Sequence, residues 1–481
     1  MTALQASIGA LCPEFIVAVG GMALMMIGVY MGDRSQRLLS LLAIALFAVA
    51  GGAAWMADGS RETAFNGAFV VDGFAVFIKL LVLAGAALVL VMGQDYIVRQ
   101  KMDRFEFPVL VVFSVLGMML MASANDLLVV FLALELMSLC LYVLAGLFKQ
   151  RLASGEASMK YFLLGAFASS FLLYGIALTY GATGTTGFDR IAAALATGSR
   201  PPLIVVGLGL MLVGFGFKIS SVPFHMWAPD VYQGAPTSVT ALIATGSKAA
   251  AFAALIRLLG SALRASQPDA TVVLWVLAAL TMTVGNVVAL SQGNLKRMLA
   301  YSSVAHVGYM LVGLAVGGNQ GASAVLFYLL AYVFTTIGTF GAITLSERAD
   351  GEAVDVKDYA GLARRNPVLA VTLALFLLSL VGIPPLAGFF GKFYVFGSAV
   401  RAGYIWLAVI AVLNSAVAAY YYLRVIVYMY MRDAEGSSAV YAPSFAGTLA
   451  LAVALAGIVL LGVMPAPFVD LAQAAVAPLF R

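Results

Sequence analysis

The sequence consists almost entirely of apolar stretches that are each long enough to cross a lipid bilayer. About 14 windows of roughly 20 apolar residues follow one another along the chain. Of the 481 residues, 63% are hydrophobic and only 10% are charged, whereas a water-soluble chain would carry about a quarter charged residues. Because lipid offers no hydrogen-bond partners to the backbone, these windows predict transmembrane helices and an all-α membrane protein.

Two windows contain prolines in their interior. The seventh, residues 202–228, contains Pro223, and the twelfth, residues 366–401, contains Pro384 and Pro385. Proline removes a backbone donor and breaks a helix. Both windows are therefore predicted to be broken helices, and their exposed backbone must be buried in protein or line a wet cavity.

Three segments recur in the same order at an offset of 166 or 167 residues. The matching pairs are Tyr142–Leu147 with Tyr309–Leu314, Tyr161–Gly175 with Phe327–Gly341, and Ser247–Arg257 with Asn414–Arg424. Each unit covers five predicted spans, and an odd number of crossings reverses orientation. The fold is therefore predicted to contain two inverted five-helix repeats with a broken helix in each, as in many transporters.

This repeat divides the chain into four predicted parts. They are three N-terminal helices (1–106), the first repeat with helices four to eight (107–264), the second repeat with helices nine to thirteen (265–432) and a C-terminal helix (433–481). The odd-numbered loops carry 15 lysines and arginines and the even-numbered loops carry 5. By the positive-inside rule the odd loops face the cytoplasm, which places both termini outside.

Four ionisable residues lie within the apolar windows, namely Glu135, Lys218, Lys248 and Lys392. A charged side chain at the centre of a bilayer costs about 2.5–3.5 kcal/mol, so such residues usually conduct ions or protons. The alternatives are lysines that extend to the membrane surface and a protonated, hydrogen-bonded core carboxyl. One acid and three bases at this depth predict a proton path.

Five further polar residues receive more local predictions. His225 and His306 are candidate proton relays, although a structural hydrogen-bonding role is about as well supported by the sequence. Lys79 and Arg257 are expected to extend their side chains to the membrane surface. Asp126 is expected to cap a helix at the membrane boundary.

No cofactor is expected in this chain. The sequence contains no GxGxxG after a strand, Walker loop, CxxC or HExxH motif. Cys12 and Cys140 both lie in apolar stretches without ligand spacing, so they predict neither a metal site nor a disulfide framework. The net charge of +5 is explained by loop lysines and arginines, so no nucleic-acid partner is expected.

Three segments together resemble one family. VPFHMWAPDVYQGAPTSVTALIATGSKAAAFAALIRLL, NLKRMLAYSSVAHVGYML and GIPPLAGFFGKFYVF resemble the antiporter-like membrane subunits of respiratory complex I, the proton-pumping NADH:quinone oxidoreductase. The PDVYQGAP motif followed by SKAAAF is similar to the N-type subunit, and the resemblance covers nearly the whole chain. A lysine at position 392 argues against the M-type subunit, which usually has a glutamate there.

The resemblance implies a role for each buried ionisable residue. Glu135 matches the acid of the fifth helix, and Lys218 matches its charge partner on the broken seventh helix. Lys248 matches the connecting base of the eighth helix, and Lys392 matches the terminal base of the broken twelfth. With Glu135 near, Lys218 is expected to hold a proton, and opening of the pair is expected to send that proton to Lys248 and Lys392.

The family also implies partners and a location. The expected partners are other membrane subunits of complex I, including the neighbouring M-type subunit and small membrane subunits, in a bacterial inner membrane. One alternative is a subunit of a multisubunit sodium/proton antiporter, which shares the fold and similar lysines. Another is a scaffold in which the buried charges only fix helix packing.

Overall fold

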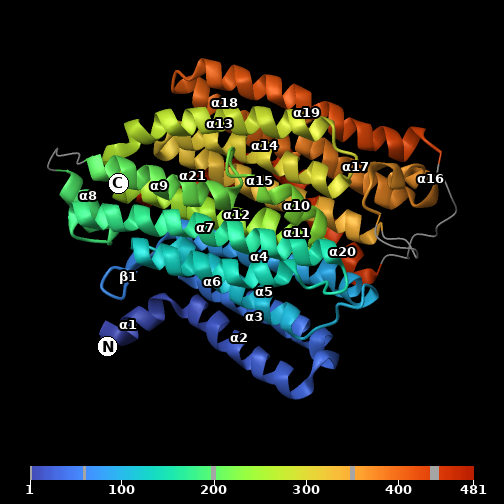
Figure 1. The fold of residues 1–481 in the computed structure, drawn as a ribbon, viewed down its shortest axis with the longest axis horizontal. Coiled ribbons are helices and arrows are strands. Elements are labelled where there is room, and N and C mark those ends of the chain that lie inside the picture. Colours follow the sequence, from blue (N-terminus) through green and yellow to red (C-terminus); the bar gives the residue numbers. More distant parts are fainter. Residues whose placement is uncertain (1–2, 58–60, 197–201, 347–352, 434–443, 481) are drawn as a thin grey trace.

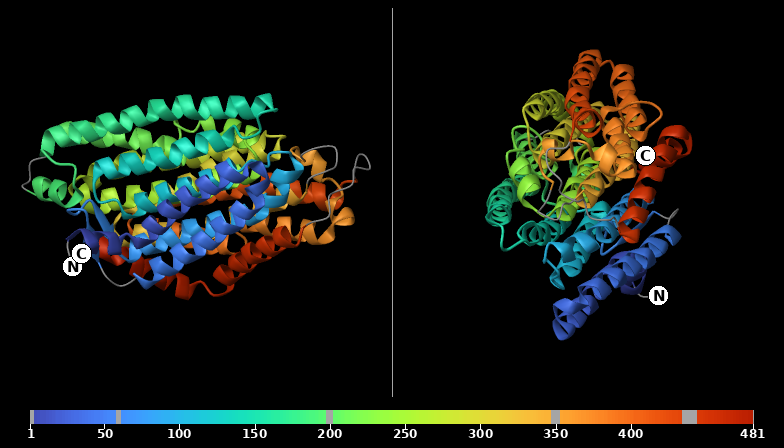
Figure 2. Two further views of the ribbon diagram at one scale, coloured as in Figure 1. Left: turned by 90° about the horizontal axis from the view of Figure 1, so that it is seen from below. Right: turned by 90° about the vertical axis from the view of Figure 1, so that its right-hand side faces the viewer.

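The computed structural model describes residues 3–57, 61–196, 202–346, 353–433 and 444–480. Within these ranges, 13 helices are long and apolar enough to cross a membrane. A further crossing consists of two shorter helices, Pro367–Val381 and Ala387–Arg401. Most of the long helices lie side by side along one direction (Figures 1 and 2). The prediction of an all-α membrane protein with about 14 spans is confirmed.

The elements follow the predicted order. The N-terminal part contains α1 (Ala3–Ala10), α2 (Cys12–Met31), α3 (Gln36–Met56), β1 (Glu62–Ala64), β2 (Phe69–Val71) and α4 (Gly73–Arg99). Next come α5 (Glu106–Ser123), α6 (Leu127–Ala145), α7 (Leu152–Thr183), α8 (Phe188–Leu195), α9 (Pro202–Ile219), α10 (Trp227–Gly234), α11 (Thr237–Leu242) and α12 (Lys248–Arg257). The remaining helices are α13 (Gln267–Leu290), α14 (Leu295–Val316), α15 (Gly318–Leu345), α16 (Leu362–Arg365), α17 (Pro367–Val381), α18 (Ala387–Arg401), α19 (Ile405–Met431), α20 (Phe445–Val463) and α21 (Ala466–Val476).

Both predicted helix breaks are present. The seventh span is divided between α9 and α10, and the twelfth is divided between α17 and α18. Gly382 directly follows α17 with φ +90°, a conformation that glycine adopts more readily than other residues. A Cβ at this position would lie 3.0 Å from the Lys392 side chain. The glycine therefore ends α17 and leaves room for the lysine.

The eighth span contains an irregularity that the sequence did not reveal. A π-helical turn, Ile243–Ser247, separates α11 from α12, and a second π-helical turn, Leu258–Ala262, follows α12. Lys248 is the first residue of α12. Single π-helical turns are frequent at functional sites because they interrupt the regular hydrogen bonding of a helix.

The backbone supports the internal repeat independently of the sequence matches. An isolated bridge pairs Asp126 with Gly187 before α6, and a second pairs Asn294 with Asp355 before α14. Both members of the second pair lie 168 residues after their counterparts. Asp126 and Asn294 each accept a hydrogen bond from a backbone N–H in the first turn of the helix that follows. The predicted capping role of Asp126 is thus confirmed.

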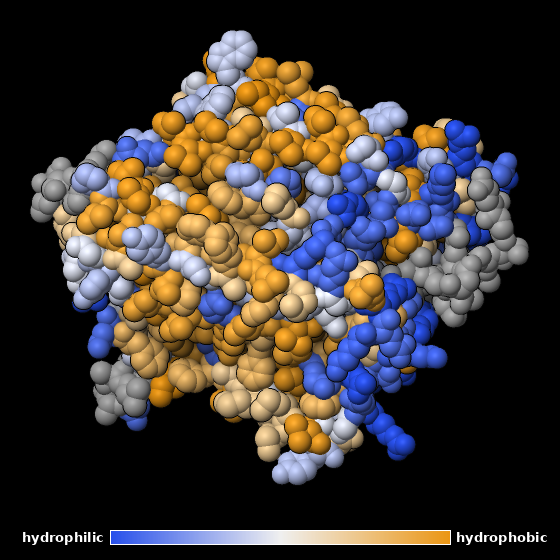
Figure 3. All heavy atoms as spheres, in the orientation of Figure 1, coloured by the Kyte–Doolittle hydropathy of each residue, from blue (hydrophilic) through white to orange (hydrophobic). Residues whose placement is uncertain are grey.

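The buried centre of the bundle is formed by a few helices from both repeats. Nearly every residue of Thr237–Ala262 is buried, and most residues of α14 and α15 are buried, whereas most residues of peripheral α2 are not. Both described chain ends lie at the same end of the bundle (Figure 1). Hydrophilic residues gather at the opposite, right-hand end in Figure 3, and apolar residues cover most of the rest of that face.

Candidate functional site

Lys218 lies in the last turn of α9, inside an aromatic enclosure. Its side chain is 1% exposed, and its Nζ lies 5.2 Å and 5.0 Å from the ring centres of Tyr142 and Tyr161. The Nζ also lies 3.5 Å from the Tyr161 hydroxyl. Aromatic faces attract an ammonium group by cation–π interaction, most strongly where water is excluded. The enclosure therefore favours a charged lysine at the helix break.

The carbonyl groups freed by this break have other partners. Trp227, at the start of α10, donates from its indole Nε1 to the Phe217 carbonyl at 2.8 Å. Its ring also stacks on Tyr161 at 4.4 Å between ring centres. Trp227 thus both closes the aromatic enclosure and satisfies exposed backbone at membrane depth, as the low-dielectric interior requires.

Glu135 lies on α6, seven residues before Tyr142. It is half-buried, and its Oε1 accepts a hydrogen bond from the Ser169 hydroxyl on α7. No ion pair joins Glu135 to Lys218, although both lie in the described part of the chain. Seven helical residues span about 10 Å. In this structure the ring of Tyr142 lies against the lysine, and the Glu135 carboxylate is bonded to Ser169 instead.

Lys248 and the hydroxyl groups around it form a second polar cluster. Its Nζ donates to the Ser303 hydroxyl of α14. The same serine oxygen lies 3.2 Å from the Tyr232 hydroxyl and 2.8 Å from the Tyr332 hydroxyl. The side chain of Lys248 has no exposed surface. This cluster connects the eighth span with α14 and α15 through groups that can both donate and accept protons.

His306 continues this polar series toward the second repeat. Its Nδ1 lies 2.8 Å from the Tyr328 hydroxyl, and its Nε2 lies 3.2 Å from the Tyr422 hydroxyl. The ring of His306 also packs against the rings of Tyr332 and Tyr309 at centre distances of 5.4 Å and 5.7 Å. The histidine is therefore positioned between the Lys248 cluster and the tyrosine next to Lys392.

Lys392 lies on α18, but its ammonium group reaches back across the break. Its Nζ donates to the carbonyl groups of Leu380 and Val381 at 3.1 Å and 2.7 Å and to the Ser415 hydroxyl at 2.8 Å. These two carbonyls belong to the last turn of α17. Unsatisfied carbonyls at a helix C-terminus carry partial negative charge and stabilise a cation. Lys218 and Lys392 are thus both held at the C-terminal end of the first half of a broken helix.

The repeat relates the surroundings of the two lysines. Tyr142 and Tyr309 occupy matching positions in YVLAGL and YMLVGL. The ring of Tyr142 lies under Lys218, and that of Tyr309 lies 5.0 Å from the Nζ of Lys392. The internal sequence matches already paired the two tyrosines with each other, but they did not reveal that each tyrosine contacts a lysine.

His225 is not brought into this series of contacts. It lies in the turn between α9 and α10, half-buried, with its ring 6.3 Å from that of Tyr301. Its Nδ1 is buried without a hydrogen-bond partner.

Lys79 and Arg257, which were expected to reach the membrane surface, instead form buried ion pairs. Lys79 has no exposed surface and lies 2.7 Å from Glu14 of α2. Arg257 is 2% exposed and binds Asp72 through both terminal nitrogens, at 2.8 Å and 2.9 Å. The prediction that Lys79 and Arg257 extend to the membrane surface was therefore wrong. Removing one partner of a buried pair costs about 3–5 kcal/mol, because the remaining charge is left uncompensated.

A polar cluster also marks one end of the broken seventh span. Asp230 of α10 accepts hydrogen bonds from Lys160 at 2.8 Å and from Arg297 at 2.6 Å. The carboxylate therefore joins α7, α10 and α14 across the boundary between the two repeats.

These features define a class of membrane protein. Two inverted helical units each contain a broken helix, and each break holds a buried lysine near the middle of the bundle. Transporters built from inverted repeats place their ion sites in this way.

Comparison with known proteins agrees with this class. Residues 124–418 match the family model described as "NADH:quinone oxidoreductase/Mrp antiporter, TM". NADH-quinone oxidoreductase subunit N of Trichlorobacter lovleyi is 48% identical over 98% of this chain and 97% of that protein. A chain of respiratory complex I from Thermus thermophilus is 39% identical, with a TM-score of 0.83 over 96% of this chain and 99% of that chain. The chain belongs to the NADH:quinone oxidoreductase/Mrp antiporter membrane family.

One further solved structure shares the fold. A chain of the Mrp complex from Dietzia sp. DQ12-45-1b superposes with a TM-score of 0.87 over 100% of this chain and 98% of that chain, at 24% identity. At that identity the likeness concerns the fold alone.

Proposed function

We propose that this chain is the N-type antiporter-like subunit of a bacterial NADH:quinone oxidoreductase and moves protons across the membrane without redox chemistry of its own. The similarity to subunit N along nearly the whole chain supports this assignment. Its partners are the other membrane subunits of complex I, among them an M-type subunit and small membrane subunits. The observation that carries the mechanism is the series of three buried lysines, with the side chains of Ser303, Tyr332 and His306 lying between Lys248 and Lys392.

The proposed path begins at Lys218 and ends at Lys392. From Lys248, hydrogen bonds run to Ser303 and on to Tyr332. The ring of Tyr332 packs against that of His306, and we assign the steps from Tyr332 to His306 and from His306 to Lys392 to bridging water molecules. Between Lys218 and Lys248, the intervening side chains are mainly aromatic, so we assign that step to water molecules bridging the two ammonium groups. His225, with its unpartnered Nδ1, serves as a relay at the edge of the path.

Glu135 is proposed to control the start of the path. When its carboxylate approaches Lys218, it stabilises the ammonium form. When the carboxylate is bonded to Ser169, as in this structure, it forms no salt bridge with Lys218, and a further separation of the two groups would release the proton toward Lys248. Redox reactions elsewhere in the complex would drive this exchange of partners.

A variant of Glu135 tests this proposal. Glu135→Gln removes the charge and is expected to lower proton uptake by vesicles containing the assembled complex. Glu135→Asp keeps the charge on a side chain one methylene shorter, so it is expected to retain part of the activity, because the interaction weakens with distance. Glu156→Gln, on the exposed start of α7, is the matched control. Unchanged pumping in Glu135→Gln would refute the switching role.

The second candidate function is sodium/proton antiport, since the matching family model includes Mrp antiporters. Proton uptake by vesicles in sodium-free buffer separates the two functions. A complex I subunit pumps at full rate without sodium when NADH and quinone are supplied, whereas an antiporter requires the counter-ion.

We also propose the four-part division 1–106, 107–264, 265–432 and 433–481, and a location in the bacterial inner membrane with both termini on the periplasmic side. The excess of loop lysines and arginines at the opposite end supports this orientation. The exposed residues Glu62 and Lys357 lie in loops of opposite predicted sides.

Cysteine labelling tests the orientation in a chain whose Cys12 and Cys140 are replaced by alanine. Lys357→Cys is expected to react with a membrane-impermeant thiol reagent only from the cytoplasmic side. Glu62→Cys is expected to react only from the periplasmic side. The reverse pattern would invert the proposed topology.

A further inference from the structure

Two cavities adjoin each other at the end of the bundle where α4 begins. Gly73 lines an apolar cavity of about 340 Å³, and Asp72, directly before it, lines a polar cavity of about 440 Å³. The C-terminal segment also contributes to both, with Ala475 in the first cavity and Pro478 in the second. None of the residues assigned to the proton path lines either cavity.

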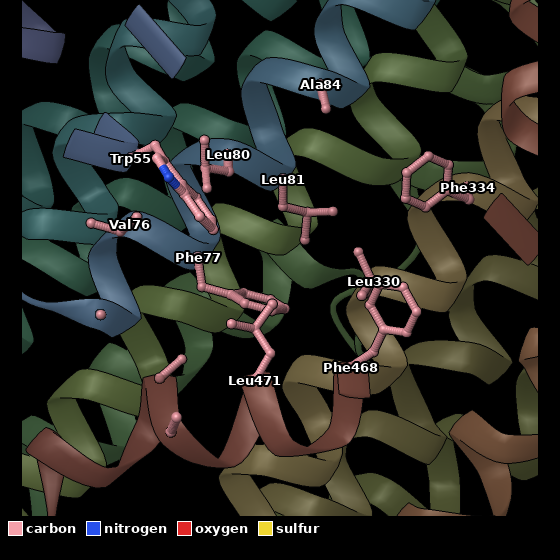
Figure 4. Close-up of a pocket in the computed structure, with 13 residues that line it drawn as sticks. Trp55, Val76, Phe77, Leu80, Leu81, Ala84, Leu330, Phe334, Phe468 and Leu471 are labelled. Carbon is pink, nitrogen blue, oxygen red and sulfur yellow. The ribbon is translucent and has the colours of Figure 1, made fainter. Parts of the chain in front are cut away.

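The apolar cavity is lined by residues from α3, α4, α15 and α21 (Figure 4). One wall is a single face of α4 from Gly73 to Ala84, and the facing walls come from α15 and α21. Eleven helical steps span about 16 Å, which matches the roughly 15 Å of hydrocarbon in one leaflet of a bilayer. Trp55, at the end of α3, also lines the cavity, and tryptophan is enriched at the level of the lipid headgroups.

The polar cavity has an excess of positive charge. Arg61 and Arg264 are exposed, and the buried Arg257 is paired with Asp72 while its Nε has no hydrogen-bond partner. Asp189 accepts a hydrogen bond from Asn125 at 3.1 Å. Three guanidinium groups face two carboxylates, which leaves one net positive charge. Burial opposes ionisation of Asp72, but the Arg257 charge outweighs it and keeps the pKa of this carboxyl group below its ordinary value.

We propose that the two cavities together bind one anionic phospholipid, with its phosphate between Arg61 and Arg264 and one acyl chain along α4. Guanidinium groups form strong, charge-assisted hydrogen bonds with phosphate, and basic pockets between transmembrane helices bind anionic headgroups. A single negative headgroup neutralises the excess charge of the lining.

Photocrosslinking within the assembled complex tests the proposal. The photoreactive residue p-benzoylphenylalanine replaces Leu80 in one variant and Leu471 in a second, so that the test does not depend on one variant assembling. The complex is reconstituted in equimolar phosphatidylglycerol and phosphatidylethanolamine. We expect adducts enriched about fivefold in phosphatidylglycerol, the preference given by one additional charge interaction near the membrane surface.

Three controls define the outcome. The same reporter at Leu413, which is 63% exposed on α19, should capture both lipids equally. The double variant Arg61→Gln and Arg264→Gln should abolish the enrichment, so that the reporters at Leu80 and Leu471 capture phosphatidylglycerol and phosphatidylethanolamine equally. Arg190→Gln, an exposed arginine on the nearby α8, should leave it unchanged. Equal capture of the two lipids in the unsubstituted cavity, or a peptide adduct from another subunit, would overturn the proposal.

Discussion

Replacement of Lys218 by alanine is expected to stop coupled proton pumping almost completely in complexes that still assemble. The alanine removes the carrier that the aromatic enclosure holds at the break of the seventh span. Any charge crossing this region would then cost about 2.5 kcal/mol or more, which corresponds to transfer slowed roughly 70-fold or more. The measurement is proton uptake by vesicles together with NADH:quinone turnover, both normalised to assembled complex.

Two further variants make this result specific to the relay. Lys218→Arg is expected to preserve assembly without restoring pumping, because arginine stays protonated and cannot pass its proton on. Lys149→Ala, at an exposed position after α6, is expected to behave like the unsubstituted protein. Near-normal pumping by an assembled Lys218→Ala complex would eliminate Lys218 as a carrier.

Replacement of both Lys248 and Lys392 by alanine is expected to reduce proton pumping only slightly more than one replacement alone. The reference is the single variant that has the lower pumping rate. If the two lysines act in series, the path is already interrupted by either change. Independent packing defects more than about 7–10 Å apart would instead combine additively in free energy. Vesicle proton uptake is compared for Lys248→Ala, Lys392→Ala and the double variant.

The scaffold alternative predicts a different pattern for these variants. If the lysines only fix helix packing, the losses in free energy add, and the amount of assembled complex falls with each substitution. Pumping per assembled complex would then stay close to normal. That combination of results would replace the proton path by a structural role for the buried charges.

The broken helices were predictable because their cause is local. Proline interrupts helical hydrogen bonding wherever it occurs, and Pro223, Pro384 and Pro385 mark both breaks correctly. The π-helical turn before Lys248 was not predicted. It contains the pair Gly246 and Ser247, but such a pair is compatible with a regular helix as well as with an irregular one. The short helices α8 and α21 were also missed, since neither is long enough to appear as a membrane span.

The sequence was sufficient to predict which charged residues of the site are buried, but it was less informative about which residues they contact. Burial of Lys218, Lys248 and Lys392 followed from their positions within apolar windows. The prediction for Lys79, that its side chain extends to the membrane surface, was wrong. Its buried partner Glu14 lies 65 residues earlier in the chain, and no residue near Lys79 in the sequence indicates this pairing. The separation of Glu135 from Lys218 likewise depends on packing between three helices, which a single sequence does not specify.

The hydrogen bond between Lys392 and Ser415 constrains how the two halves of the chain could diverge. Ser415 occupies the position that matches Lys248 in the other unit, and its oxygen lies 2.8 Å from the Lys392 ammonium group. Had both copies kept a lysine there after an ancestral duplication, two ammonium groups would meet at a cost of about 4 kcal/mol at 4 Å. With serine at position 415, the second unit places a neutral hydrogen-bond acceptor beside its buried ammonium group, where a lysine matching Lys248 would repel it.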